Sequence, residues 1–173
     1  MKDLRIDREA VGNTRPDDLV WRVIEPAYEA VSIHDGPEVL DSQLASLTRG
    51  QRALLALHWT VAEVCNGGFD QYFINPTGDL AEEARAGFER IGAKGTVRLL
   101  DKVFTAFPGG PPPRDSERRA EMLDALDEDE REKLFQVFDD EFYDLMDSEL
   151  YGSAYAYIQA HPHEFFRDEP GAS

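Results

Sequence analysis

The sequence predicts an all-α fold, built as a single compact domain of several helices. Apolar residues recur at the spacing of three and four residues that an amphipathic helix requires. Polar residues with the spacing of helix caps precede two of these patterns, Thr48 with Gln51 and Asp127 with Glu130. The length of 173 residues suits one domain. We expect a loosely held arm at residues 1–16, the domain at 17–166 and a polar tail at 167–173.

The first half of the domain is predicted to surround one central helix. We expect helices at residues 17–31, 38–47 and 49–65. Pro26 should kink or split the first of them. The third is apolar around most of its circumference, which predicts a central and buried helix. Asn66-Gly67-Gly68 should end it, because glycine adopts the left-handed conformation of a helix C-cap.

The second half is predicted to contain shorter helices and one long acidic helix. The aromatic segment 69–76 should form a short helix or a compact loop, because no partner strand lies nearby. Asp79 with Glu82 has the spacing of another cap, for a helix that ends near Ile91. Further helices are expected at residues 96–107, 116–126, 127–146 and 149–160, with a proline-rich surface linker at 108–113 and with Phe165 and Phe166 packed after Pro162.

The composition excludes several classes of protein. With 18 basic and 35 acidic residues, the formal net charge is −17, which disfavours direct binding to nucleic acid and to anionic membranes. No apolar run approaches the length of a membrane span, and the N-terminus lacks the apolar core of a signal peptide. The single cysteine, Cys65, cannot form an internal disulfide, which fits a reducing cytoplasm.

The negative charge is concentrated in one segment, because residues 115–149 contain fifteen acids and only four bases. On a helical wheel the segment's long helix has an apolar stripe: Leu134, Phe138, Phe142 and Leu145. Its carboxylates gather on the opposite side: Asp129, Asp140, Asp144 and Asp147, flanked by Glu132 and Asp139, with Lys133 among them. The helix would be about 30 Å long, close to the pitch of one DNA turn at about 34 Å. The row could imitate a phosphate strand, and the alternative is an ordinary solvated face.

Catalytic and metal sites are not indicated. The acids at 139–144 lack the alternating ligands and the central glycine of an EF-hand, and two histidines near the C-terminus are too few for a metal site. His58 and Cys65 share a helical face but lie roughly 10 Å apart along the axis, so we expect a core histidine and a buried thiol. The sequence therefore predicts no catalytic residue, no metal and no cofactor.

Several segments resemble a known family. Asn66-Gly67-Gly68-Phe69-Asp70-Gln71-Tyr72-Phe73-Ile74-Asn75-Pro76-Thr77-Gly78 is the longest, and residues 91–94, 107–108, 139–143 and 157–165 add to it. Over about residues 54–166 the chain is similar to the DNA mimic protein 19-like family. The resemblance implies an all-α fold that is commonly dimeric. For the member that names the family, it also implies an acidic surface that imitates duplex DNA and competes for a transcriptional repressor or a histone-like protein.

The motif that carries the resemblance is apolar and turn-forming, so we interpret it as structural. Its aromatic residues should pack, and its amides should satisfy backbone groups; a shared binding groove is the alternative. The residues concerned are Asn66, Gly67, Gly68, Phe69, Gln71, Tyr72, Phe73 and Asn75. Any mimicry would then depend on the surface carboxylates.

Three functions follow from these observations. The leading hypothesis is a non-enzymatic, cytoplasmic DNA mimic, whose carboxylates occupy the basic surface of a transcription regulator or nucleoid protein and block it. The alternative is an immunity or antitoxin-type protein that neutralises a basic toxin such as a nuclease. An enzyme that uses a pocket lined by aromatic and amide residues is the third, and the sequence offers it no nucleophile or base.

Overall fold

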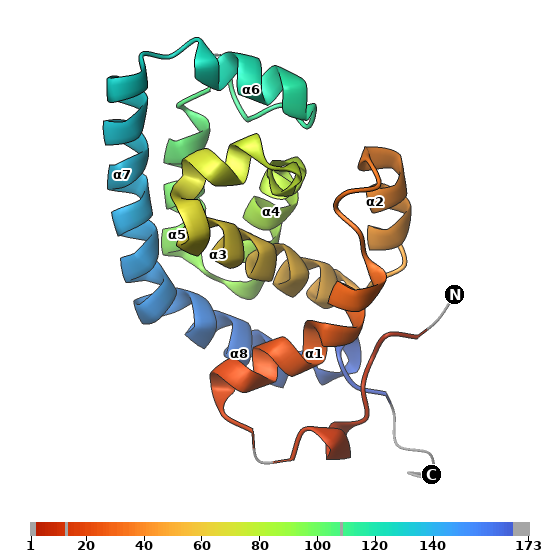
Figure 1. Ribbon diagram of the computed structural model, residues 1–173. Helices are drawn as coiled ribbons and strands as arrows, with labels where there is room; N and C mark the ends of the chain where they lie inside the picture. Colours follow the sequence, from red (N-terminus) through yellow and green to blue (C-terminus); the bar gives the residue numbers. More distant parts are fainter. Residues whose placement is uncertain (1–2, 13, 108, 168–173) are drawn as a thin grey trace.

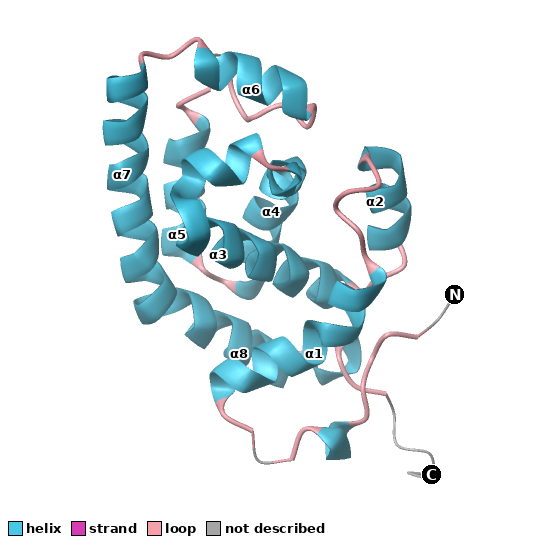
Figure 2. Ribbon diagram, viewed as in Figure 1, coloured by secondary structure: helices cyan, strands magenta, loops and turns pink. Residues whose placement is uncertain are grey.

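A computed structural model describes residues 3–12, 14–107 and 109–167, and this part of the chain is all-α (Figures 1 and 2). Of the predicted arm, residues 1–2 and 13 lie outside the described residues, and of the predicted tail only Arg167 lies within them. The longer helices are α1 (Pro16–Ala30), α2 (Pro37–Leu44), α3 (Arg49–Ile74), α4 (Ala81–Ile91), α5 (Lys94–Phe104), α6 (Ser116–Asp124), α7 (Glu128–Leu145) and α8 (Tyr151–Ala160). Short 3₁₀ turns occupy Arg8–Ala10, Pro76–Leu80 and Pro162–Glu164, and a π-helical turn, Met146–Leu150, joins α7 to α8.

Helix α3 is central, as its apolar circumference predicts. It packs against α1, α4, α6 and α7, and Figure 1 shows it in the middle of the molecule, with α7 along one side. Leu54, Leu55, Leu57 and Val64 are buried around it. Cys65 is exposed, so the expectation of a buried thiol was wrong. It lies on a side of α3 that the core does not cover, whereas the adjacent Val64 is fully buried.

Most of the predicted helix starts are confirmed. Thr48 and Gln51 form the capping box of α3, and the Asp127 side chain accepts a hydrogen bond from the amide of Glu130 at the start of α7. Gly92, with φ of 83°, ends α4 in the left-handed conformation. The predicted cap at Asp79 was wrong: Leu80 precedes α4, and the carboxylate of Asp79 pairs with an arginine instead.

Two helices continue past the residues at which we expected them to break or end. Helix α1 continues through Pro26, which lies inside it without splitting it. Helix α3 does not end at residue 66, because the chain kinks at Gly67 and Gly68 and then resumes as a helix to Ile74. For residues 69–76 we expected a short helix or a compact loop, and residues 69–74 form the last part of α3. Gly68 has φ of 74° and ψ of −178°, a conformation that is almost restricted to glycine.

The N-terminal segment, expected to be loosely held, contacts the other end of the chain. Ile6 donates a backbone hydrogen bond to Phe165 (2.9 Å) and accepts one from Arg167 (2.9 Å). The guanidinium of Arg8 lies 5.4 Å from the centre of the Phe166 ring. Phe165 and Phe166 are buried, as predicted.

The apolar side of α7 differs by one position from the predicted stripe. Phe135, Phe138 and Phe142 are buried, whereas Leu134 is 40% exposed. The prediction for Leu134 was wrong because the wheel places both 134 and 135 at the edges of the apolar arc. The kinked part of α3 lies on the side of Phe135, whose ring is 6.2 Å from that of Phe73.

Candidate functional site

The kink of α3 is held by one side of α7. The amide of Phe69, the first helical residue after the kink, donates to the carboxylate of Asp139 (2.8 Å). The hydroxyl of Tyr143 donates to the carbonyl of Val64, in the last turn before the kink (3.0 Å). Backbone groups at helix ends lack partners within the helix, so both contacts supply what the break removes. Asp139 and Tyr143 are four residues apart and therefore lie on the same side of α7.

Asp139 thus faces α3, although the wheel placed it beside the outward carboxylates. It is half-buried, and burial raises the pKa of its carboxyl against the lowering effect of the Phe69 amide. A Cβ on Gly68 would overlap its carboxylate. Gly68 is therefore needed both for its conformation and for the close approach of α7.

The other residues of the 66–78 segment also make internal contacts. Glu63 accepts hydrogen bonds from the amide groups of Gln71 (3.0 Å) and Asn75 (2.9 Å) and so bridges the two parts of α3. Phe69, Tyr72 and Phe73 are buried, and the ring centres of Phe69 and Phe142 are 5.4 Å apart. Gly67 and Asn66 are exposed at the kink. These contacts support the structural interpretation of the segment.

Arg119 is a central residue that the sequence analysis missed. It is fully buried, and its guanidinium donates to the carbonyls of Phe73 (2.9 Å) and Asn75 (3.1 Å) at the end of α3. It also pairs with Asp79 (2.7 Å). A Cβ on Gly78 would lie 2.7 Å from its Nε, which explains the glycine there. The sequence signal was weak, because an arginine in an acid-rich run normally faces solvent.

The outward side of α7 carries carboxylates of a different kind. Asp129, Asp140 and Asp144 are exposed, as is Asp147 just beyond the helix. Within the part of the chain that the structure describes, none of these four forms an ion pair with a basic side chain. Lys133, which lies among them, is also unpaired there. The helix is about 27 Å long at 1.5 Å per residue. It therefore presents uncompensated negative charge along a rigid element.

Glu132 lies seven residues before Asp139, on the same side of α7, in a groove of about 430 Å³ beside the kink. The groove is lined by Gly67, Asp70, Glu128, Arg131, Glu132, Phe135, Gln136 and Asp139. Arg131 lies 3.3 Å from Asp70 and 3.4 Å from Asp124, so it is engaged with acids of this chain. Burial raises the pKa of Asp70. The structure thus separates the six predicted acids: four face solvent, Glu132 lines the groove and Asp139 holds the kink.

Another acid of the same segment is also used internally. Glu149, in the π-helical turn, accepts hydrogen bonds from the amides of Gly95 and Thr96 (2.9 Å each) at the start of α5. Burial opposes its ionisation, but these hydrogen bonds outweigh that effect and lower the pKa of Glu149. Some acids of the acid-rich segment, residues 115–149, therefore cap helices of this chain.

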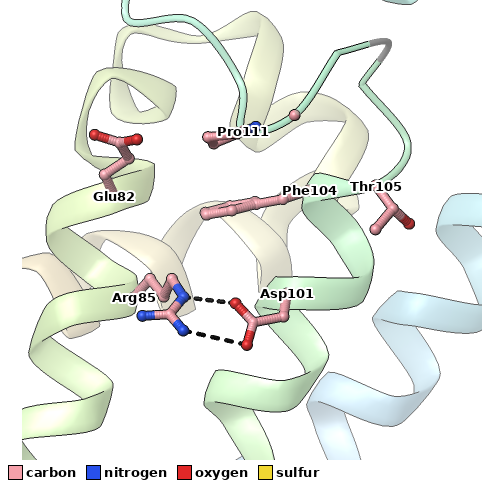
Figure 3. Close-up of a pocket in the computed structure, with 7 residues that line it drawn as sticks. Glu82, Arg85, Asp101, Phe104, Thr105 and Pro111 are labelled. Atoms are coloured by element: carbon pink, nitrogen blue, oxygen red, sulfur yellow. Dashed lines mark hydrogen bonds and ion pairs between the residues drawn. The ribbon is translucent and has the colours of Figure 1, made fainter.

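A second hollow, of about 500 Å³, lies between α4 and α5 (Figure 3). Figure 3 shows the ring of Phe104 between Pro111 and the pair of Arg85 and Asp101. That pair is bidentate, at 2.5 and 3.2 Å, and the hydroxyl of Thr105 donates to a backbone carbonyl of its own helix. The charged pair in this hollow is therefore engaged within the chain.

His58 lies elsewhere, half-buried between Trp21 and Tyr28, with ring centres at 4.9 and 5.3 Å. Burial lowers its pKa. Across the described residues, no three metal-binding side chains gather in a way that could hold an ion. No described helix combines the length and the apolar character needed to cross a membrane.

Comparison with known protein families gives a match to DMP19-like protein over residues 45–161. This span is about two thirds of the chain and runs from α3 to α8, so it includes the kink and the acidic helix. The chain belongs to the DMP19-like protein family. Membership in the DMP19-like family supports a DNA-mimic-type role at the level of the family. Searches of curated proteins and of solved structures found no match.

Proposed function

We propose that this DMP19-like protein is a non-enzymatic DNA mimic that binds the basic DNA-binding surface of a transcription regulator or nucleoid protein and blocks it. The observation that carries the proposal is the outward side of α7. Asp129, Asp140 and Asp144 are exposed there and form no ion pairs within the described chain. These carboxylates can replace phosphates as partners for lysine and arginine.

The charge distribution supports a role in steering. Within α7 there are eight acidic and two basic residues, and one of the basic residues, Arg131, is already engaged. A concentrated field of one sign accelerates association with an oppositely charged surface and is screened by salt. Binding to a basic protein should therefore be fast at low salt and weaken steeply as salt rises.

A gel-shift competition tests the proposal. A purified histone-like protein and a helix-turn-helix repressor would each be bound to labelled DNA, and this protein added across a salt series. We expect DNA to be released at low salt. The combined variant Asp129→Asn, Asp140→Asn and Asp144→Asn should compete about tenfold less well.

The matched control removes the same charge elsewhere. Glu29→Gln, Asp35→Asn and Glu38→Gln lie on exposed positions of α1, its following turn and α2, away from α7. We expect this variant to compete like the wild type at matched salt. DNA binding that stays unchanged at every salt concentration would contradict the proposal. Tight binding to one basic nuclease only would favour the immunity-type alternative.

The homodimer and the cytoplasmic location remain predictions. The homodimer rests on the family resemblance, and sedimentation equilibrium of the purified chain measures it directly. The location rests on the single cysteine and would be checked by cell fractionation.

A further inference from the structure

Two apolar side chains interrupt the acidic surface of α7. Val137 is 62% exposed, the highest fraction among the exposed large apolar residues of the described chain, and Leu134 is 40% exposed. They are three residues apart and so are neighbours on the helix surface. The core of the molecule does not use them, because Phe135, Phe138 and Phe142 fill the inward positions of α7.

Acidic residues lie on both sides of this apolar pair along the helix. Asp129 and Glu130 precede it, and Asp140 and Asp144 follow it. Asp129 and Asp140 are separated by eleven residues, or roughly 16 Å along the axis. Protein interfaces commonly have an apolar centre and a polar rim, and the outward side of α7 has that arrangement.

We propose that Leu134 and Val137 form the apolar centre of the partner-binding surface, and that the partner is a basic protein which presents an apolar side chain between two groups of lysine or arginine. This inference rests on the proposed function. Charge complementarity selects the occupant, because a second copy of α7 would bring its own exposed carboxylates, Asp129, Asp140 and Asp144, against the same surface. A basic protein surface compensates this charge, and its apolar residues cover Leu134 and Val137.

The two parts of such a surface respond differently to salt. Carboxylate contacts to lysine and arginine are screened, so they set the salt dependence and the rate of association. Apolar side chains carry no charge, so their burial contributes the same binding free energy at low and at high salt. This contribution mainly slows dissociation.

The test uses Val137→Ala and Leu134→Ala, with Val39→Ala as the matched control. Val39 is 40% exposed and lies on α2, far from α7. The probes are the two DNA-binding proteins of the gel-shift assay and a pair of synthetic basic helical peptides. The peptides have the same number of lysine and arginine residues, and one has a leucine stripe where the other has serine.

We expect Val137→Ala and Leu134→Ala each to weaken binding about five- to tenfold at every salt concentration, with an unchanged salt dependence. Val39→Ala should bind like the wild type, and the leucine peptide should bind more tightly than the serine peptide. All three variants should keep the fold, because the side chains are exposed and alanine favours helix. Circular dichroism checks this.

Three results would overturn the inference. If Val137→Ala binds like Val39→Ala while the triple acidic variant is weakened, the apolar centre is refuted and the proposed function stands. If neither the apolar nor the acidic variants weaken binding, both proposals fail. If Val137→Ala instead abolishes self-association in sedimentation experiments, a second copy covers this surface.

Discussion

Asp139 and Asp140 are adjacent in α7, yet their side chains have different surroundings. Asp139 is half-buried against the kink of α3 and accepts a hydrogen bond from the amide of Phe69. Asp140 faces solvent, and its contact is the side-chain amide of Gln136, one turn earlier (3.1 Å). We therefore expect the kink-facing side of α7 to determine stability and the outward side to make the proposed contacts with a partner. Substitutions on the two sides should have separable effects.

The largest loss of stability is expected at Arg119, which binds the end of the kinked helix α3. Arg119→Ala removes hydrogen bonds to the end of α3 and leaves the carboxylate of Asp79 without its partner. Breaking a buried ion pair on one side typically costs about 3–5 kcal/mol. We expect a loss of this size in the free energy of urea-induced unfolding. Arg118→Ala, at the exposed neighbouring position, should change it by less than about 0.5 kcal/mol.

A smaller but still large effect is expected at the kink itself. Gly68→Ala forces a side chain into a glycine-only conformation and against the carboxylate of Asp139, and it should lower the unfolding free energy by about 2–3 kcal/mol. Gly152→Ala is the matched control, because that glycine lies in α8 with open space around its Cβ position. It should be neutral or stabilising, by up to about 1 kcal/mol. Equal melting temperatures for the two variants would refute the strained kink.

Loss of the Asp139 contact should lower the unfolding free energy by an intermediate amount. Asp139→Ala leaves the amide of Phe69 without its acceptor and should cost about 1–2 kcal/mol. Asp139→Asn keeps an acceptor oxygen, so its loss should be clearly smaller. The exposed neighbour provides the control, since Asp140→Ala should stay within about 0.5 kcal/mol of the wild type.

Asp139 should also make the unfolding free energy depend on pH. Burial raises the pKa of Asp139 above its unfolded value, so at neutral pH the ionised carboxylate stabilises the fold less than the protonated carboxyl group would. The wild type therefore gains stability as the pH falls through the raised pKa. The unfolding free energy of Asp139→Asn relative to wild type should therefore shift in favour of the wild type on acidification. A difference that stays constant with pH would show that burial does not act on this carboxyl.

The smallest effect on stability is expected on the outward side. Neutralising Asp140 and Asp144 relieves repulsion near the negative end of α7, and neutralising Asp129 loses a small favourable interaction with its positive end. The triple variant to Asn should unfold within about 0.5 kcal/mol of the wild type, while its binding is weakened. A large drop in melting temperature would show that these acids are structural.

Local signals in the sequence predicted much of the fold. The capping box at Thr48 and the cap at Asp127 each depend on residues within a few positions of one another, and both are present. The periodicity of residues 49–65 also identified the central helix. The family segment at 66–78 was interpreted as structural from its composition alone.

The parts that the sequence could not reveal depend on distant contacts. Asp139 resembles its acidic neighbours until the kink of α3 is placed beside it, and Arg119 resembles a surface arginine until the carbonyls of residues 73 and 75 converge on it. Asp79 has the spacing of a cap but is taken by Arg119. Which of Leu134 and Phe135 is buried depends on which side of α7 the neighbouring helix occupies.

Within the described chain, two side chains of α7, those of Asp139 and Tyr143, hydrogen-bond to the backbone of α3 at the kink. The exposed positions of the helix can accordingly diverge in charge and size between lineages without disturbing the scaffold. Homologues that keep these two contacts could thus change their target through substitutions at exposed positions alone. Conservation at the kink would then report ancestry, and specificity would have to be sought at positions such as 129, 137 and 144.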